Sequence, residues 1–238
     1  MKDYKQIVNW LDEYLTNNKL ECFVVGVSGG IDSAVTSTLC ALTGKPVYVL
    51  NMPIKQKQEQ VDLSDQHIKW LEENYKNVVG LKINLTTSFA EFEGAISKQL
   101  GEGFSSLLGF ANSRSRLRMV TLYQVAQSKN GLVVGTGNKV EDFGVGFYTK
   151  YGDGGVDISP IGDCLKTQVW DMGRELGLPQ EIIDAYHDAL PLNRYGSERE
   201  IAEVICFLAS PNASFVTGQT VAADGGFEAT GVGLPALR

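Results

Sequence analysis

Hydrophobic and polar positions divide the chain into short apolar runs and longer amphipathic stretches. The apolar runs lie at 22–27, 46–51, 78–83 and 131–136, and each has the length of a β-strand. Strands this apolar are typical of a sheet that is covered on both faces, and the helical stretches between them imply right-handed βαβ crossovers. The pattern therefore predicts an α/β fold with a doubly wound, Rossmann-like parallel sheet.

Apolar residues between the strands recur at helical spacing. Residues 110–129 and 164–176 are predicted to form helices, and the chain opens with an amphipathic helix. The apolar face of that first helix consists of Ile7, Val8, Leu11, Tyr14 and Leu15. The tryptophans also lie at helical spacing from other apolar residues, which predicts core positions for Trp10, Trp70 and Trp170.

Beyond about residue 189 the pattern changes. A further helix is predicted after Ser197, with an inward face formed by Ile201, Ala202, Val204, Ile205 and Leu208. Residues 220–223 then predict one more strand, and a helix followed by a strand can extend the edge of a parallel sheet. We therefore expect a first domain at 1–188 and a tail at 189–238 that completes the same sheet.

Composition and charge narrow the class of protein. With 238 residues, of which 43% are hydrophobic and 21% charged, the chain can bury a substantial core. No apolar run approaches the roughly 20 residues that span a bilayer, and the first helix lacks the apolar centre of a signal peptide. We therefore expect a cytoplasmic protein that does not enter membranes. The net charge of -7 argues against a broad nucleic-acid surface.

The cysteines and histidines show no metal-site spacing. The cysteines are far apart and form no CxxC or CxxH pair, so we expect buried free thiols. They are Cys22, Cys40, Cys164 and Cys206. The two histidines, His67 and His187, are expected at the surface without a catalytic role.

The strongest chemical signal is the run Ser-Gly-Gly-Ile-Asp-Ser at 28–33, between the first strand and a helix. Paired glycines let backbone N–H groups approach a phosphate, and the helix N-terminus adds partial positive charge. Asp32 stands where a Walker loop carries Lys, so we infer that a divalent cation balances the phosphate charge. The alternative is an ordinary serine-glycine turn, which is disfavoured because every fixed position of the motif matches in a strand-to-helix context.

Three loops are expected to converge on one site. In open parallel sheets, ligands bind beyond the carboxyl ends of the strands. The loops at 28–33, 51–57 and 136–141 all emerge at those ends of the predicted strands. Asp32 and Glu141 would bring carboxylate oxygens to this place, and such oxygens suit Mg²⁺.

The loop at 28–33 resembles the pyrophosphate loop of ATP pyrophosphatases, which adenylate a substrate. Five stretches together resemble ammonia-dependent NAD synthetase in order and spacing across residues 1–185: 28–33, 114–118, 135–141, 147–157 and 160–166. The run Thr-Lys-Tyr-Gly-Asp-Gly-Gly at 149–155 is the most family-specific of them. The resemblance implies the fold of the adenine nucleotide alpha hydrolases and a homodimer with the dinucleotide site built across its interface.

The resemblance also implies a carbon–nitrogen ligase reaction in two steps. The nicotinate carboxylate of deamido-NAD attacks the α-phosphate of ATP and gives an adenylate and pyrophosphate. Ammonia then displaces AMP and leaves the amide of NAD. Charge must be neutralised at both reactants, which calls for Mg²⁺ on the phosphates and basic donors near the acid.

Residue roles follow from the same resemblance. The catalytic residues would be Asp32, Thr136 and Lys166. The ATP-binding residues would be Ser28, Gly29, Gly30, Asp32, Ser33, Thr136 and Lys166. Deamido-NAD would be held by Arg118, Lys150, Asp153 and Asp157, and Mg²⁺ by Asp32 and Glu141.

Several of these residues have a purely structural alternative. Arg118 could lie on the solvated face of the long helix at 110–129. Asp153 and Asp157 lie among glycines and could cap turns. Glu141 could decorate a helix end, and Lys166 could be an exposed helical residue.

The tail departs from the NAD synthetase pattern, which calls for a closing loop rich in Pro, Thr and acidic residues and then a terminal helical segment. The chain from about residue 189 instead resembles the carboxyl-terminal end of short-chain dehydrogenases. Oxidoreductase activity is disfavoured, because no glycine-rich dinucleotide fingerprint follows the first strand and no Tyr has Lys four residues later.

Three hypotheses remain for the function. The first is a working NAD synthetase. The second is a catalytically impaired chimeric scaffold that binds nucleotide but turns over slowly, because the segment that would exclude water from the adenylate is missing. The third, a tRNA-thiolating or other pyrophosphatase-loop enzyme, is disfavoured by the acidic charge and by the lack of paired catalytic cysteines.

Overall fold

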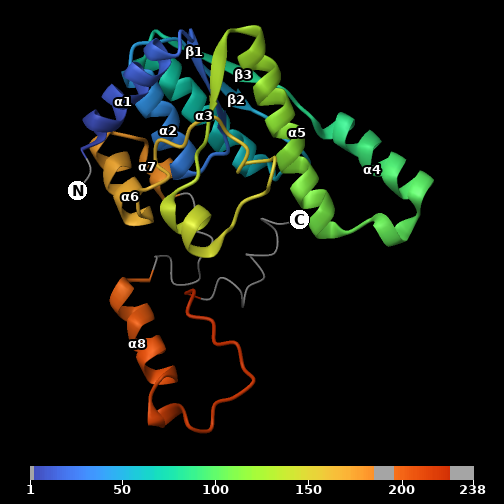
Figure 1. The fold of residues 1–238 in the computed structure, drawn as a ribbon, viewed down its shortest axis with the longest axis vertical. Coiled ribbons are helices and arrows are strands. Elements are labelled where there is room, and N and C mark those ends of the chain that lie inside the picture. Colours follow the sequence, from blue (N-terminus) through green and yellow to red (C-terminus); the bar gives the residue numbers. More distant parts are fainter. Residues whose placement is uncertain (1–2, 185–195, 226–238) are drawn as a thin grey trace. The chain divides into compact units, whose positions relative to one another are not determined.

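The computed structural model describes residues 3–184 and 196–225. The chain divides into two compact units, the first ending at Ile183 and the second beginning at Asp184. In Figure 1 the sheet and most of the helices belong to the first unit, and helix α8 belongs to the second.

The first unit is built on a parallel four-stranded sheet with the order β3-β2-β1-β4. The strands are β1 (Cys22–Val27), β2 (Val47–Asn51), β3 (Val78–Lys82) and β4 (Gly131–Val134). Each strand falls within one of the apolar runs, so the predicted parallel sheet is confirmed. The chain adds β2 and β3 on one side of β1 and then places β4 on the other side. The topological switch point, where such sheets bind ligands, therefore lies between β1 and β4.

Helices cover both faces of this sheet (Figure 1). One face is covered by α1 (Tyr4–Asn17), α2 (Ile31–Leu42), α3 (Gln58–Asn74), α6 (Lys166–Glu175) and α7 (Gln180–Ile183). The other face is covered by α4 (Thr86–Leu100) and α5 (Leu107–Ser128). The two-sided cover is that of a doubly wound fold, as the sequence predicts.

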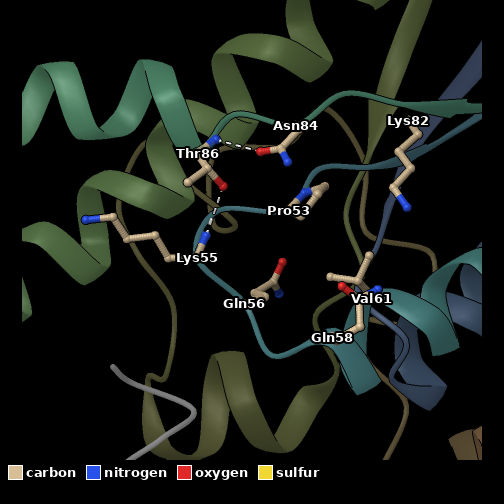
Figure 2. A pocket seen from close by; sticks show the side chains of 8 residues that line it. All are labelled: Pro53, Lys55, Gln56, Gln58, Val61, Lys82, Asn84 and Thr86. Atoms are coloured by element: carbon tan, nitrogen blue, oxygen red, sulfur yellow. Dashed lines mark hydrogen bonds between the residues drawn. The ribbon is translucent and has the colours of Figure 1, made fainter.

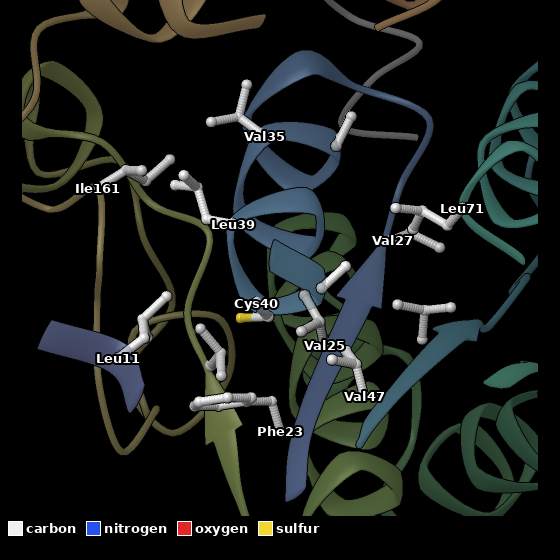
Figure 3. Packing of buried hydrophobic residues seen from close by; sticks show 14 of the residues in the cluster. Leu11, Phe23, Val25, Val27, Val35, Leu39, Cys40, Val47, Leu71 and Ile161 are labelled. Carbon is white, nitrogen blue, oxygen red and sulfur yellow. The ribbon is translucent and has the colours of Figure 1, made fainter. Parts of the chain in front are cut away.

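The sheet has a cluster of buried apolar residues on each face, because side chains along a strand point alternately to opposite faces. In β1, Phe23 and Val25 point into the cluster beneath α1 and α2, whereas Val24 points to α4 and α5. Figure 3 shows Phe23 and Val25 packed with Leu11 of α1 and Leu39 of α2. All are completely buried, and truncating a buried Leu such as Leu39 to Ala costs about 2–5 kcal/mol of stability in proteins generally.

The second unit contains α8 (Glu198–Leu208) and a short 3-10 helix at Pro211–Ala213. Ser197 caps α8 by accepting a hydrogen bond from the backbone of Glu200 at 3.3 Å. None of the α8 residues is buried within the second unit and Ile205 is 59% exposed, so packing of its apolar face on the sheet stays a prediction. The strand expected at 220–223 is absent, since these residues have no strand hydrogen bonding and are exposed.

Three further predictions from the sequence are wrong. His67 is 1% exposed, because it lies on the side of α3 that packs against α2 and not on the solvent side. Trp10 is 41% exposed on α1, where its ring contacts Tyr14 instead of the core. Cys206 is exposed on α8, whereas the other three cysteines are buried free thiols as expected. His187 lies outside the described residues.

Within the described ranges, no helix is both long and apolar enough to cross a membrane.

Candidate functional site

The loop between β1 and α2 lies at the switch point of the sheet. Ser33 holds it closed by donating its hydroxyl to the Gly30 carbonyl at 2.9 Å and accepting the Ser28 amide at 3.2 Å. Gly30 is the N-cap of α2 and offers no side chain to the first turn. The N–H groups at the start of α2 can therefore donate hydrogen bonds to an anion, as expected for a phosphate loop.

Gly29 is required in this loop for two separate reasons. Its φ of +83° is a conformation that side chains rarely adopt. A Cβ at this position would also lie 3.0 Å from Leu63 Cβ and 3.1 Å from the Gln60 carbonyl oxygen, both on α3. The loop is thus packed directly against α3.

Three charged side chains from distant segments meet beside the loop. The Lys166 ammonium donates to Asp32 Oδ2 and, at 3.1 Å, to Glu141 Oε1. Asp32 lies in the first turn of α2, Glu141 follows β4, and Lys166 begins α6. The structure therefore brings together the predicted acid pair and the predicted lysine.

Lys166 stays positively charged in this setting. Burial alone lowers the pKa of its ammonium, but the charges and hydrogen bonds of Asp32 and Glu141 outweigh burial and hold the pKa above its ordinary value. The link between the backbones of Lys139 and Cys164, an N–H to carbonyl bond of 2.9 Å, keeps the Glu141 segment next to the start of α6.

Asn138 completes the cluster and was not predicted from the sequence. Its side chain is 0% exposed, and its Nδ2 donates to Asp32 Oδ1 at 3.0 Å. Its Oδ1 accepts the backbone amides of Val140 at 3.0 Å and Glu141 at 3.2 Å. The only signal in the sequence was its place two residues after Thr136 in a loop that leaves a buried strand.

The acid pair fits a magnesium ion that also binds a nucleotide. The described residues contain no group of three or more His, Cys, Asp and Glu side chains placed to hold a metal by themselves. Mg²⁺ is usually held by one or two carboxylates together with waters and substrate phosphates, so two carboxylates suffice beside a phosphate loop. The Lys166 ammonium contacts both Asp32 and Glu141, so the two carboxylates lie close enough to share one positive charge.

Arg118 lies on α5 behind the loop that follows β2. Its Nε donates to the Met52 carbonyl at 2.9 Å. Burial and the charge of Arg114 lower the pKa of Arg118 to about 10, although Asp153 acts in the opposite direction. Arg118 is therefore not a residue of a freely solvated helix face, and it still carries its charge at neutral pH.

The segment at 149–157 is tied to α5 and β4 by its two aspartates. Asp153 accepts hydrogen bonds from the Ser115 hydroxyl at 2.7 Å and the Thr149 amide at 2.9 Å. Asp157 accepts from the Tyr123 hydroxyl at 2.9 Å and the Val133 amide at 2.7 Å. Both carboxylates thus stabilise the local fold, and their binding of a dinucleotide stays a prediction.

The remaining predicted site residues make fewer contacts. Lys150 is exposed, and its ammonium lies 4.9 Å from the ring centre of Tyr151. The Lys150 carbonyl accepts Arg116 Nε at 3.0 Å, which places this stretch beside α5. Thr136 follows β4 and is half-buried. The roles of Thr136 and Lys150 are still predictions.

A polar pocket of about 180 Å³ lies at the carboxyl ends of β2 and β3 (Figure 2). Its lining residues are Pro53, Lys55, Gln56, Gln58, Val61, Lys82, Asn84 and Thr86. The Lys55 amide donates to the Thr86 hydroxyl at 3.2 Å, which joins the two loops on either side. The sequence predicted the loop at 51–57 in this region but not the contribution of the turn that follows β3.

Comparison with known proteins gives two family matches. A family model described as NAD synthase matches residues 3–189. A second model, described as Enoyl-(Acyl carrier protein) reductase, matches residues 165–228 and overlaps the first at its start. The two matches agree with the expected change of family near the tail.

One relative agrees with the NAD synthase match. The NH(3)-dependent NAD(+) synthetase of Sulfurisphaera tokodaii is 39% identical over 178 residues, which cover 74% of this chain and 60% of that protein. The chain therefore spans less than two thirds of the length of this relative.

Two solved structures share the fold over nearly their whole length. An NMN synthetase from Francisella tularensis has a TM-score of 0.70 and 30% identity, covering 98% of this chain and 94% of that one. An NH3-dependent NAD synthetase from Campylobacter jejuni has a TM-score of 0.68 and 26% identity, covering 92% and 89%.

Proposed function

Because the chain belongs to the NAD synthase family, we propose that it amidates deamido-NAD to NAD with ATP and ammonia. The observation that carries this proposal is the cluster at the switch point, where a phosphate loop, two carboxylates and Lys166 meet. Such a set suits an adenylation, in which charge builds up on phosphate oxygens. The likeness to NH(3)-dependent NAD(+) synthetases favours a working ligase over a catalytically impaired scaffold.

The loop at 28–33 would bind the phosphates of ATP. The amides at the start of α2 and the Ser28 hydroxyl would bind the leaving pyrophosphate. When bound between Asp32 and Glu141, Mg²⁺ would supply positive charge that offsets the phosphate oxygens. Lys166 would then be free of its carboxylate partners and would donate to the phosphates, together with Thr136.

α5 and the segment at 149–157 would bind the substrate that carries the carboxylate. The nicotinate carboxylate oxygen forms a bond to the α-phosphorus, and the bond from that phosphorus to the β-phosphate oxygen breaks. Ammonia then attacks the acyl carbon, loses a proton and expels AMP. Arg118, charged and half-buried, would bind the anionic substrate, with Lys150 at the exposed end and with Asp153 and Asp157 holding the segment in place.

A second candidate is amidation of a mononucleotide. It is favoured by the structural match to an NMN synthetase, which covers nearly all of both chains. The two candidates share the adenylation step and differ only in whether the substrate carries an adenylyl half.

One steady-state assay tests both candidates. The protein is supplied with ATP, Mg²⁺ and ammonia, and with either deamido-NAD or nicotinate mononucleotide, and kcat/KM is measured for each. We expect deamido-NAD to be preferred, with turnover on the order of 1 to 10 per second. A preference for the mononucleotide would favour the second candidate. ATP binding with negligible turnover on both would favour the impaired scaffold.

We also propose that the protein acts as a homodimer in the cytoplasm, where ATP and pyridine nucleotides are metabolites. The support for a dimer is exposed apolar surface on α5. Leu107 is 83% exposed, Leu108 64% and Val120 66%. Elsewhere on α5, Leu122 is buried and Leu117 and Val125 pack on the core, so these three residues do not add to the exposed surface.

A further inference from the structure

Asn138 joins two segments that lie far apart in sequence. Its amide nitrogen reaches Asp32, which precedes it by 106 residues, and its amide oxygen holds the backbone at Val140 and Glu141. The side chain is completely buried, so water cannot replace these bonds.

The two oxygens of Asp32 have different partners because of this bond. Oδ1 accepts from Asn138, whereas Oδ2 accepts from the Lys166 ammonium. The bond to Asn138 therefore turns one oxygen of Asp32 toward the place where positive charge is held, opposite Glu141. The same side chain controls where the Glu141 backbone lies.

We propose that Asn138 is a positioning residue that holds Asp32 and Glu141 at the spacing needed to bind one divalent cation together with a nucleotide. The inference rests on the proposed function, in which these two carboxylates hold Mg²⁺. Residues that orient metal ligands commonly change metal affinity by 10- to 100-fold when they are replaced.

An amide is required at this position by the chemistry of its partners. Asp32 is an acceptor and needs a donor, whereas the two backbone amides are donors and need an acceptor. A carboxylate would satisfy the backbone but would repel Asp32. Alanine would satisfy neither side.

A merely structural role is the competing explanation. Two of the three bonds of Asn138 are local, and they could serve only to start the helical turn at Val140–Val145. Asn138→Asp separates the two explanations, since it keeps the local acceptor and loses the donor to Asp32. A purely local role predicts that N138A, which loses the acceptor, weakens Mn²⁺ binding more than N138D, which keeps it.

The experiment measures binding of Mn²⁺, as a probe for the metal site, by the electron paramagnetic resonance signal of the free ion. The parent protein, N138D and N138A are compared with and without ATP. The control is Asn77→Asp, which loses amide bonds to the carbonyls of Ala41 and Lys45 away from the site. We expect the dissociation constant of Mn²⁺ to rise about 10-fold or more in both Asn138 variants and to stay unchanged in N77D.

The readout does not depend on NAD formation, so it separates this inference from the proposed function. A parent whose Mn²⁺ affinity depends on Asn138 but which makes no NAD would support the positioning role and contradict the proposed reaction. Affinity for Mn²⁺ in N138D within twofold of the parent would overturn the positioning role. A parent that binds no Mn²⁺ would also overturn it.

A second measurement covers the case in which N138D is too unstable to titrate. In the double variant D32N/N138D, the amide at 32 can donate to the carboxylate at 138, which restores the bond in the reverse direction. We expect the double variant to regain most of the thermal stability lost in N138D, because the two side chains are coupled. Additive losses of stability would contradict the inference.

Discussion

At the scale of single residues, burial and neighbouring charges shift the pKa values of three side chains in different directions. Lys166 is largely buried, yet it stays charged because two carboxylates contact it. Arg118 is half-buried, and burial together with the charge of Arg114 lowers its pKa to about 10. His67 is buried without a charged partner, and burial lowers its pKa to about 4.

Asp32→Ala should abolish Mg²⁺-dependent binding of ATP. The variant removes one of the two carboxylates that fit the cation and leaves Glu141 alone with Lys166. Isothermal titration calorimetry with ATP, with and without Mg²⁺, measures the effect. Glu73→Ala is the control, because that carboxylate belongs to an exposed pair with Lys69 on α3. An unchanged Mg²⁺-dependent affinity in D32A would contradict the assignment.

His67 should make the fold less stable in acid. Its Nε2 shares a hydrogen bond of 2.8 Å with the Ser37 hydroxyl, and its Nδ1 has no partner within the described residues. The folded chain keeps the ring neutral down to about pH 4, whereas the unfolded chain takes up a proton near pH 6.5. Stability is therefore fully present above pH 6.5 and falls as the pH drops toward 4, by up to about 3 kcal/mol.

The variant His67→Gln isolates this contribution. Glutamine can keep a bond to Ser37 and does not titrate. Urea unfolding at each pH measures the unfolding free energy of both proteins. We expect the parent to lose more unfolding free energy than H67Q as the pH falls from 6.5 to 4. A constant difference across this range would show that His67 is not the source of the acid sensitivity.

At the scale of elements, the phosphate loop depends on α3 as well as on α2. α2 supplies the N–H groups, and α3 supplies the surface against which Gly29 packs. A buried hydrogen bond between Ser37 of α2 and His67 of α3 joins these two helices. The loop is therefore positioned by the packing of two helices and not by its own sequence alone.

Gly29→Ala should impair both stability and nucleotide binding. Gly44 provides a matched control, since its φ of +74° is similar but nothing lies within 4 Å of a Cβ there. Both variants should lose about 1–2 kcal/mol from the left-handed backbone. G29A should lose more, because its Cβ meets the Gln60 carbonyl and Leu63. Thermal unfolding and ATP calorimetry measure both effects, and equal behaviour of the two variants would show that contact with α3 is unimportant.

At the scale of the whole molecule, two kinds of surface stand out. Apolar side chains are exposed over α4, α5 and the short helix between them, including Leu100 at 55% and Phe104 at 67%. The second unit also exposes apolar residues, with Phe215 at 100%. Large exposed apolar patches on soluble proteins commonly mark contact sites.

The chain should form a dimer at micromolar concentration through the α5 surface. Light scattering coupled to size-exclusion chromatography measures the mass. We expect the parent to elute as a dimer and the variant Leu107→Asp/Val120→Asp to elute as a monomer, since two charges would be buried at the interface. Val216→Asp, on the second unit and 43% exposed, is the control that should stay dimeric. A monomeric parent would contradict the proposal.

The sequence by itself determined the sheet and the main features of the site. Four apolar runs of strand length, separated by helical periodicity, predict a parallel sheet, and all four became its strands, whereas the strand order is known only from the structure. The motif at 28–33 carries its own geometry, because its glycine and its strand-to-helix context are local properties. Asp32, Glu141 and Lys166 could be named for the same reason, each within a short recognisable stretch.

Only the tertiary structure decided which side chains meet and what surrounds them. The role of Asn138 depends on a partner 106 residues away, and the burial of His67 depends on how α3 rotates against α2. The described structure has no strand at 220–223 for a related reason, since strand propensity has little effect unless a neighbouring strand bonds to the segment. Local patterns are encoded by neighbouring residues, whereas burial, charge pairing and strand pairing depend on segments that only folding brings together.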